Sequence, residues 1–504
     1  MCPQKAVSLL MAFLVLVAVL CSCSQEQKPK SDEQSGTSSV SLSQAENDTE
    51  ESPVPDTKDA KQKLTFLTTF EHNYAGLKPW VEDFARLNPG VETEIEYGLD
   101  SLSSESQWDN YRTRWTTEVM SGEAPDILLD EGYINPAQYE QSGLMYDIYE
   151  WMDKDPDFQD TDYFHNLFEA FEVNGHLYTL PVTYYFQFVY LNDALLQASG
   201  KQLNQWDKIN YRDIMEIYHS VEKQGLLAED FTLEYMDTQP AYSMFLNTEL
   251  VDYVSLEDRS TTLESPEFIE YLTATKDIPT KRKASDGLAM VGGRAQYMMK
   301  EFAKSNAEGN TSLMMDLNIS LDGWIDHMDE LVPGCAGPFV LTSVQGTQSF
   351  YPELKVCVPT SCKNPELAWK FLKFMIAPPE VPAYGQRWFP EGSVDLSKTF
   401  PVTNRENFRT FAKLYSQGAN YVQETGGAPW PEDFDLISAD CPVTDELLNK
   451  LEIIIEGITK TTDRFGPLRD LMLPELQEYY ETDTVTAEQC AKRLQEIADL
   501  YLQE

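Results

Sequence analysis

The stretch LTFLTTFEHNYAGLKPWVEDFARLNPGVETEIEY, residues 64–97, contains a complete strand–helix–strand unit. Its first seven residues are of the apolar and β-branched types that favour strands. The next part has helical spacing, and its apolar stripe consists of Leu77, Trp80, Val81, Phe84 and Leu87. NPG at residues 88–90 ends the helix, and VETEIEY then alternates as a half-buried strand does. Two strands joined by a helix in this way are expected to pair in parallel.

The same pattern continues downstream. A second helix carrying Trp108, Tyr111 and Trp115 ends at Ser121-Gly122, before the strand PDILL at residues 125–129. The order strand–helix–strand–helix–strand predicts an α/β fold with a parallel sheet covered by helices. Ligands of such sheets bind at the carboxyl ends of the strands, which are residues 69–71 and 130–131 here.

Composition excludes several classes of protein. The chain has 504 residues, of which 42% are hydrophobic and 12% aromatic, enough for two to four domain-sized units with a large core. Its 83 acidic and 38 basic side chains give a net charge of −45. This balance argues against a nucleic-acid partner, whose phosphates require clustered Lys and Arg, and against docking on anionic lipid.

Residues 1–22 are predicted to be a lipoprotein signal peptide. Residues 6–20 are almost wholly apolar, but about 15 residues are too few for a comfortable membrane span. The run ends Leu20-Cys21-Ser22-Cys23, which resembles a bacterial lipobox. This resemblance implies that Cys23 is lipidated and becomes the mature N-terminus. Lipidation at Cys21 and a plain secreted protein are the alternatives.

Residues 23–62 are predicted to be a disordered acidic tether. The segment after Cys23 contains nine acidic and four basic residues and no aromatic residue, so little apolar burial offsets the entropy of ordering it. A coil of this length spans about 35 Å, which suits a domain held clear of a membrane.

The mature chain has five further cysteines, which cannot all pair because their number is odd. Cys357 and Cys362 lack the CxxC spacing of a zinc site. Cys490 lies on the apolar stripe of a predicted helix, which favours a core thiol. The full set is Cys335, Cys357, Cys362, Cys441 and Cys490.

Four segments, in order along the chain, resemble family 1 extracellular solute-binding proteins, the carbohydrate-binding components of ABC importers that include the maltose-binding protein. These segments are APDILLDEGYINPAQYEQSGLMYDIYEWM (124–152), NGHLYTLPVTYYFQFVYLNDALLQASG (174–200), SCKNPELAWKFLKFMIAPPE (361–380) and TAEQCAKRLQEIADLYLQE (486–504). Locally, the third has Asn364 as a candidate N-cap before Pro365, and the last has a Thr486/Gln489 capping box.

The resemblance implies a two-lobe, periplasmic-binding-protein-like fold with a hinge and a ligand cleft between the lobes. Residues 63–504 would form this bilobal domain. Lobe one would span about 63–183 and 352–400, and lobe two about 184–351 and 401–504. The expected partners are a carbohydrate ligand and the transmembrane subunits of an ABC permease. The protein would be a monomer, lipid-anchored to the cell membrane and facing outside the cytoplasm.

Ligand contacts are expected at strand ends and loops, where aromatic rings and carboxylates together suit a sugar. Carried over from the family, they are Phe70, Glu71, Tyr74, Asp130, Glu131 and Tyr133 in lobe one, Tyr184 and Tyr185 after the crossover, and Phe302 and Trp430 in lobe two. The alternative for each aromatic residue is core packing. For Glu71 and Asp130 it is an ordinary acid at a helix start.

No enzyme motif is found, so no catalytic residue, cofactor or metal is expected. The acidic run at residues 153–162 hints at a calcium loop, but Phe158 and Phe164 occupy the places where that loop needs Gly and Glu. The sequence leaves open a different solute, such as a peptide or polyamine, and a surface adhesin or glycosidase lipoprotein.

Overall fold

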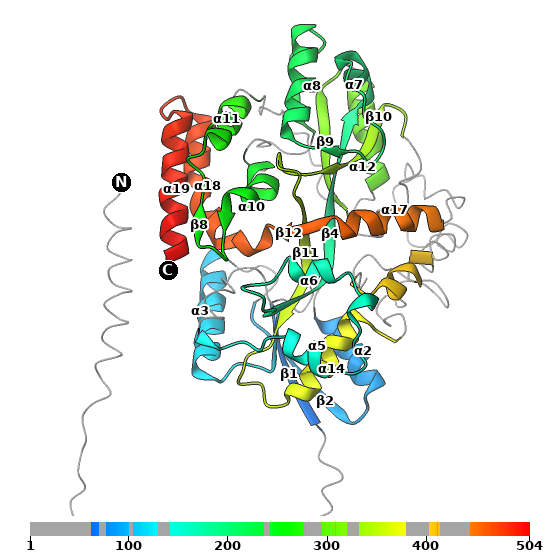
Figure 1. Cartoon of the computed structure of the whole chain (residues 1–504), viewed down its shortest axis with the longest axis vertical. Helices are drawn as coiled ribbons and strands as arrows, with labels where there is room; N and C mark the ends of the chain where they lie inside the picture. Colours follow the sequence, from blue (N-terminus) through cyan, green and yellow to red (C-terminus); the bar gives the residue numbers. More distant parts are fainter. Residues whose placement is uncertain are drawn as a thin grey trace, which may run out of the picture. The chain divides into compact units, whose positions relative to one another are not determined.

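The central element of the fold is a ten-stranded mixed sheet (Figure 1). Seven of its strands follow the order β2-β1-β3-β11-β4-β10-β5. Of the other three, β12 pairs with β11, β9 pairs with β4, and β6 pairs with β9. The computed structural model describes residues 62–69, 77–99, 104–129, 142–235, 242, 244–276, 278, 295–307, 309–319, 332–379, 403–410, 412–413 and 444–503.

The described strands are β1 (Gln62–Thr68), β2 (Val91–Tyr97), β3 (Ile127–Leu129), β4 (Thr179–Asn192), β5 (Lys208–Ile209), β6 (Thr232–Glu234), β7 (Val254–Ser255), β8 (Ser260–Thr261), β9 (Ser312–Ile319), β10 (Cys335–Leu341), β11 (Gln348–Cys357) and β12 (Ile458–Thr461). The described α-helices are α2 (Lys78–Leu87), α3 (Glu105–Ser121), α5 (Tyr149–Lys154), α6 (His165–Glu169), α7 (Asp193–Ser199), α8 (Tyr211–Lys223), α10 (Leu250–Tyr253), α11 (Pro266–Thr275), α12 (Ala295–Ala307), α14 (Pro365–Ile376), α17 (Asp445–Glu456), α18 (Gly466–Glu481) and α19 (Ala487–Gln503). Short helical turns are η2 (Asp160–Asp162), the π-helical η3 (Phe245–Glu249) and η4 (Asp463–Phe465).

The strand–helix alternation predicted for residues 64–129 is confirmed. β1 lies between β2 and β3 and pairs with both in parallel. The predicted stripe of α2 is buried at Leu77, Trp80, Val81 and Phe84. α3 ends at Gly122, whose φ of 73° is a left-handed conformation that glycine adopts without a Cβ clash.

Two long strands connect two regions of the sheet. β4 is paired with β11 along Thr179–Tyr185, and from Phe186 onward it pairs with β9 and β10 instead. β11 begins beside β12 and then runs along β4 and β3. We call the region of β1–β3 the first lobe, the region of β5, β6, β9 and β10 the second lobe, and β4 and β11 the connecting strands. The change of partners along β4 lies within two residues of the lobe boundary expected at 183/184.

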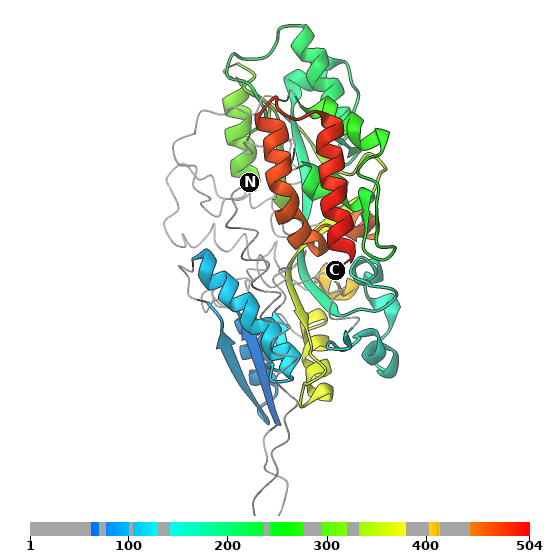
Figure 2. The ribbon, with the colours of Figure 1, turned by 90° about the vertical axis from the view of Figure 1, so that its left-hand side faces the viewer.

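One large buried cluster belongs to the second lobe, whereas the other joins the first lobe to second-lobe residues such as Phe302 of α12 and Val340 of β10. α18 and α19 pack side by side on the second-lobe core (Figures 1 and 2). α17, expected in lobe two, contacts α6, which was expected in lobe one. Asn166 of α6 donates from Nδ2 to the carbonyls of Ile455 and Ile458, at 2.7 and 3.0 Å. Phe408 likewise lies edge-on to Phe164. Residues after 400 therefore contact both lobes.

Local capping predictions have mixed outcomes. The Thr486/Gln489 capping box is confirmed, with Gln489 N donating to Thr486 Oγ1 and Thr486 N donating to Gln489 Oε1. Pro365 opens α14 as predicted, but Asn364 makes no side-chain cap. Its Nδ2 donates to the carbonyl of Lys63 instead, at 2.9 Å, so Asn364 ties α14 to β1.

Asp126 fastens three segments of the first lobe together. Its carboxylate accepts hydrogen bonds from Thr65 N and Oγ1 of β1, at 2.9 and 2.7 Å, and from Lys363 N before α14, at 2.8 Å. Asp126 itself directly precedes β3. The buried carboxylate of Asp126 thus joins the first lobe to the segment before α14, in addition to the pairing of β3 with β11.

The described thiols are structural. Cys335, Cys357, Cys362 and Cys490 are all buried, which confirms Cys490 as a core thiol. Burial raises the pKa of the Cys335, Cys362 and Cys490 thiols to about 12. Cys441 lies outside the described residues. Among those residues, no helix has the length and apolar content needed to cross a bilayer.

Candidate functional site

Most residues expected to contact ligand lie outside the part of the chain that the structure describes. These are Phe70, Glu71, Tyr74, Asp130, Glu131, Tyr133 and Trp430, together with the predicted lipidation site Cys23. Tyr184, Tyr185 and Phe302 lie within it.

Tyr184 and Phe302 are packed in the hydrophobic core. The Tyr184 ring is buried and lies edge-on to Phe350, with centroids 5.3 Å apart. Burial raises its pKa well above the usual value. Phe302 is fully buried and lies edge-on to Tyr235. A ligand could touch either ring only if this packing were displaced. Ligand contact at Tyr184 and Phe302 stays a prediction. The backbone of Tyr185 pairs with Tyr351 across β4 and β11.

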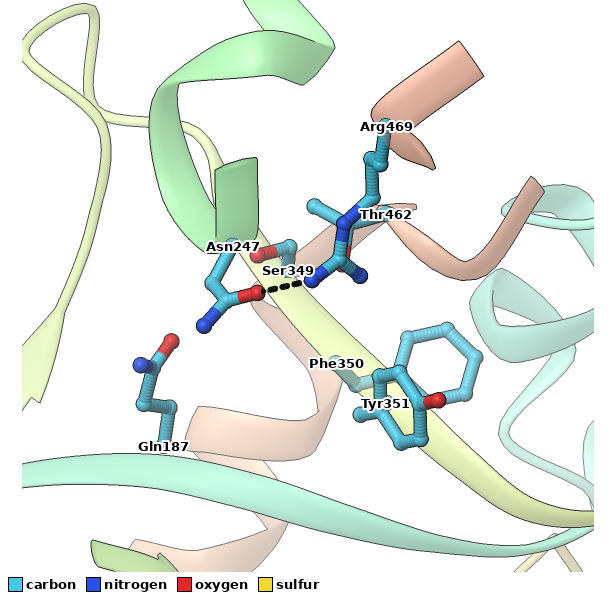
Figure 3. A pocket seen from close by; sticks show the side chains of 7 residues that line it. All are labelled: Gln187, Asn247, Ser349, Phe350, Tyr351, Thr462 and Arg469. Carbon is cyan, nitrogen blue, oxygen red and sulfur yellow. Dashed lines mark hydrogen bonds between the residues drawn. The ribbon is translucent and has the colours of Figure 1, made fainter. Parts of the chain in front are cut away.

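A pocket of about 240 Å³ lies where the connecting strands meet elements of the second lobe (Figure 3). It is lined by Gln187 of β4, Asn247 of η3, Ser349, Phe350 and Tyr351 of β11, Thr462 after β12, and Arg469 of α18.

The alternation of β11 places an aromatic ring at this pocket. Successive side chains of a strand point to opposite faces. Gln348 and Phe350 are accordingly buried, while Ser349 is half-buried and 46% of Tyr351 is exposed. Phe350 packs edge-on to both Phe171 and Tyr184 beneath the strand. Tyr351 is thus an exposed aromatic residue on a firmly packed connecting strand.

Arg469 supplies the charge of the pocket. Its Nη2 donates to Asn247 Oδ1 at 2.7 Å, and the dashed line in Figure 3 joins the two side chains. Arg469 is the only charged residue among the seven that line it. The pocket therefore combines two aromatic rings, two amides, three hydroxyls and one guanidinium.

A second hollow of about 560 Å³ shares Tyr351 and Arg469 with the first. It extends to Arg112 of α3 in the first lobe and to the start of α18 in the second. We call the two hollows together the hinge groove. The remaining residues that line the second hollow are Leu246, Asp463, Gly466, Pro467, Asp470, Leu471 and Leu473.

The other charges of the second hollow are largely paired. Arg112 pairs with Asp109 on α3. Asp463 pairs with Lys355 of β11, whose Nζ lies 3.1 Å from Asp463 Oδ2, and both side chains are buried. This buried ion pair fastens a connecting strand to the segment that begins α18. An ion pair between β11 and η4 therefore fixes the position of Asp463, one of the residues that line the groove.

The described residues provide no group of three or more side chains suited to a metal ion. In the acidic run at 153–162, Phe158 and Phe164 are buried in the core. Asp155 accepts hydrogen bonds from Lys373 Nζ at 2.7 Å, Asp157 N at 2.9 Å and Trp369 Nε1 at 2.8 Å. Burial opposes ionisation of this carboxyl, but these bonds and the positive charge of Lys373 outweigh it and lower the pKa of Asp155. This carboxylate stabilises the contact with α14.

Asn247, Tyr351 and Arg469 were not among the residues predicted from the sequence. The alternation of QSFY at residues 348–351 is a usable signal for Tyr351, because it separates an inward from an outward aromatic ring. Asn247 and Arg469 have no comparable local signal, since they reach the groove only through the packing of η3 and α18.

Comparison with known proteins gives a family match and a common fold. The family model for bacterial extracellular solute-binding proteins matches residues 80–389. The sugar-binding protein MalE from Xanthomonas citri has a TM-score of 0.57 and 11% identity, covering 88% of this chain and 98% of that one. A periplasmic oligogalacturonide-binding protein from Yersinia enterocolitica has a TM-score of 0.54 and 16% identity, covering 88% and 99%.

A structure of a de novo designed esterase also matches, with a TM-score of 0.53, 16% identity and coverage of 88% and 99%. No curated protein sequence matches the chain significantly. The structural similarities confirm the predicted α/β, two-lobe, periplasmic-binding-protein-like fold.

Proposed function

Because the chain belongs to the bacterial extracellular solute-binding proteins, we propose that it is the substrate-binding component of an ABC importer. It captures a sugar or oligosaccharide by closure of its lobes and delivers this ligand to the transmembrane permease. Two proteins with the same fold are named for sugar and oligogalacturonide binding, which supports a carbohydrate ligand.

The observation that carries the proposal is the exposed Tyr351 ring in the hinge groove, surrounded by amide, hydroxyl and guanidinium groups. The apolar face of a sugar ring packs on such an aromatic ring, and its hydroxyls bond to the polar groups. Tyr351 also lies on a connecting strand, and the groove has walls from both lobes. A ligand bound there favours a closed arrangement in proportion to its differential affinity for that state.

A thermal-shift screen against mono- and oligosaccharides tests the proposal directly. A cognate sugar should raise the melting temperature, and in small-angle scattering it should lower the radius of gyration. A screen in which peptides or polyamines stabilise the protein and no sugar does would favour the alternative solute class instead.

Tyr351→Ala should weaken binding of a sugar found in that screen by about 1–3 kcal/mol, the range for loss of a well-packed aromatic contact. Its effect on unliganded stability should be small, because Tyr351 is 46% exposed. Calorimetry gives the affinity, and Leu500→Ala on the exposed face of α19 is the matched control. Equal affinities of wild type and Tyr351→Ala would remove Tyr351 from the site. The contacts proposed at Asp130 and Trp430 are open to the same measurement.

Binding and release require no covalent chemistry, so we propose no enzymatic activity. A glycosidase would instead release reducing sugar on incubation with oligosaccharides. An adhesin would bind an immobilised glycan surface without affinity for the free sugar.

The N-terminus is proposed to anchor the protein outside the cytoplasm, with Cys23 lipidated and residues 24–62 as the tether. Cys23→Ala should leave unprocessed or shed protein, because the acyl chains could no longer be attached. Membrane fractionation measures this, and Cys21→Ala is the control that should remain anchored. A Cys23→Ala protein that partitions like wild type would place the anchor elsewhere.

A further inference from the structure

The residues that line the first hollow of the hinge groove differ in charge from the chain as a whole. Acidic residues outnumber basic residues 83 to 38 overall. None of the seven residues that line this hollow is acidic, and one, Arg469, is basic. A solute-binding pocket with this lining does not suit a polyamine, whose charges would face a guanidinium with no carboxylate among the lining residues.

The charge of Arg469 is not neutralised within the described part of the chain. Its hydrogen-bond partner there is the neutral amide of Asn247, and no ion pair joins it to a described carboxylate. Arg114, Arg409 and Arg493, by contrast, each pair with a glutamate. A guanidinium carries five N–H donors in a planar fork, so the single bond to Asn247 uses a small part of its capacity.

From this arrangement we propose that the hinge groove binds a saccharide bearing an acidic group, a carboxylate or a sulfate, and that Arg469 pairs with that group. The inference rests on the proposed function and narrows its substrate class. A charge enclosed by lobe closure is costly unless it is paired, and an anionic ligand supplies the missing partner. The planar fork matches a carboxylate or sulfate through two parallel hydrogen bonds.

The second hollow indicates how the saccharide is oriented in the hinge groove. Its charges at Arg112 and Asp463 are paired internally. Asp470, which also lines it, has no ion pair among the described residues and would repel a second acidic unit. Leu471 and Tyr351 provide exposed apolar surface there. The acidic unit of the saccharide therefore occupies the first hollow beside Arg469. A further unit, which needs no charge, extends across Tyr351 into the second hollow.

The test uses matched pairs of saccharides that differ only in the acidic group. Oligogalacturonides are compared with their methyl esters, and one sulfated oligosaccharide with its unsulfated form, by calorimetry on the full mature protein. We expect the charged member of at least one pair to bind at least tenfold more tightly. The pair that shows the preference identifies the group as a carboxylate or a sulfate.

Variants then assign the preference to Arg469. Arg469→Gln should reduce the preference for the charged saccharide to less than threefold. The affinity for the neutral saccharide of the pair should change little. Asn247→Asp keeps the arginine but gives it an internal carboxylate, so it should also reduce the preference. Arg493→Gln removes a charge from α19 outside the groove, and its preference should match that of wild type.

The outcomes separate this inference from the function on which it rests. If neutral saccharides bind as tightly as their charged partners, or if Arg469→Gln retains the wild-type preference, the acidic ligand class is overturned while sugar binding stands. If no saccharide of either kind binds, both proposals fail.

Discussion

Lys355→Met should lower the free energy of unfolding by about 3–5 kcal/mol, the usual cost of removing one partner of a buried ion pair. The Lys355 side chain is 4% exposed and that of Asp463 is 9% exposed, with 3.1 Å between Nζ and Oδ2. Without the ammonium group, Asp463 would remain buried with its main countercharge lost. The variant should also weaken ligand binding, because this pair joins β11 to the start of α18 beneath the hinge groove.

Urea unfolding of wild type and variant measures this loss. Lys63→Met is the matched control, since Lys63 also lies on a strand and pairs with a carboxylate, Glu94, but both are exposed. Its unfolding midpoint should stay near that of wild type. The double variant Lys355→Met/Asp463→Leu should recover much of the lost stability, because an apolar pair leaves no unpaired charge. A Lys355→Met variant as stable as the control would show that the pair contributes no stability.

The second large expected effect is a loss of folding stability as Glu249 ionises with rising pH. Its carboxylate is buried at the end of η3. The residue is 2% exposed, and both of its oxygens accept from Val344 N, at 3.1 and 3.2 Å. Burial, with a smaller contribution from the charge of Asp252, raises its pKa from 4.5 to about 7, although the bond from Val344 N opposes the shift. The folded state therefore holds this proton more tightly than the unfolded state does.

The sign of the pH dependence follows from that difference. The stability that the raised pKa contributes is fully present below pH 4.5 and is lost as the pH rises through 7. The loss should amount to about 2–3 kcal/mol across this window. Glu249→Gln, which cannot ionise, should lose less stability than wild type between pH 5 and pH 8.

Urea titrations at the two pH values give this comparison. Glu229→Gln, at an exposed position of the same lobe, should retain the wild-type pH dependence. The difference between Glu249→Gln and wild type is the informative quantity, because other groups titrate in the same window. Identical pH profiles for these two proteins would contradict the assignment of the raised pKa to Glu249.

The sequence predicted local structure better than the site. The stripe of α2 and the glycine that ends α3 depend on neighbours within one or two turns, so periodicity was enough to find them. Asn364 shows where local reasoning fails, because the carbonyl of a distant strand attracts its side chain away from the helix end.

The site was harder to predict because its members come from distant parts of the chain. Asn247, Tyr351 and Arg469 meet only after η3, β11 and α18 have packed together. Tyr184 precedes the change of partners along β4, where the strand is covered by other elements, so its ring became part of the core. Arg469 also has no sequence signal of its own, because an isolated arginine in an acidic chain is indistinguishable from an ordinary surface residue.

The pairing of β11 with the first lobe constrains the order in which the chain can fold. Cys357 of β11 lies against Leu128 of β3 although 229 positions separate them, and Lys363 reaches Asp126 across 237. During synthesis, β1–β3 emerge long before the strand that covers their edge. Until then this edge has unpaired backbone groups, and closing so long a loop is slow. The lobe that begins the chain is therefore among the last parts to be completed, and a nascent chain stopped before residue 348 would retain an open, aggregation-prone sheet edge.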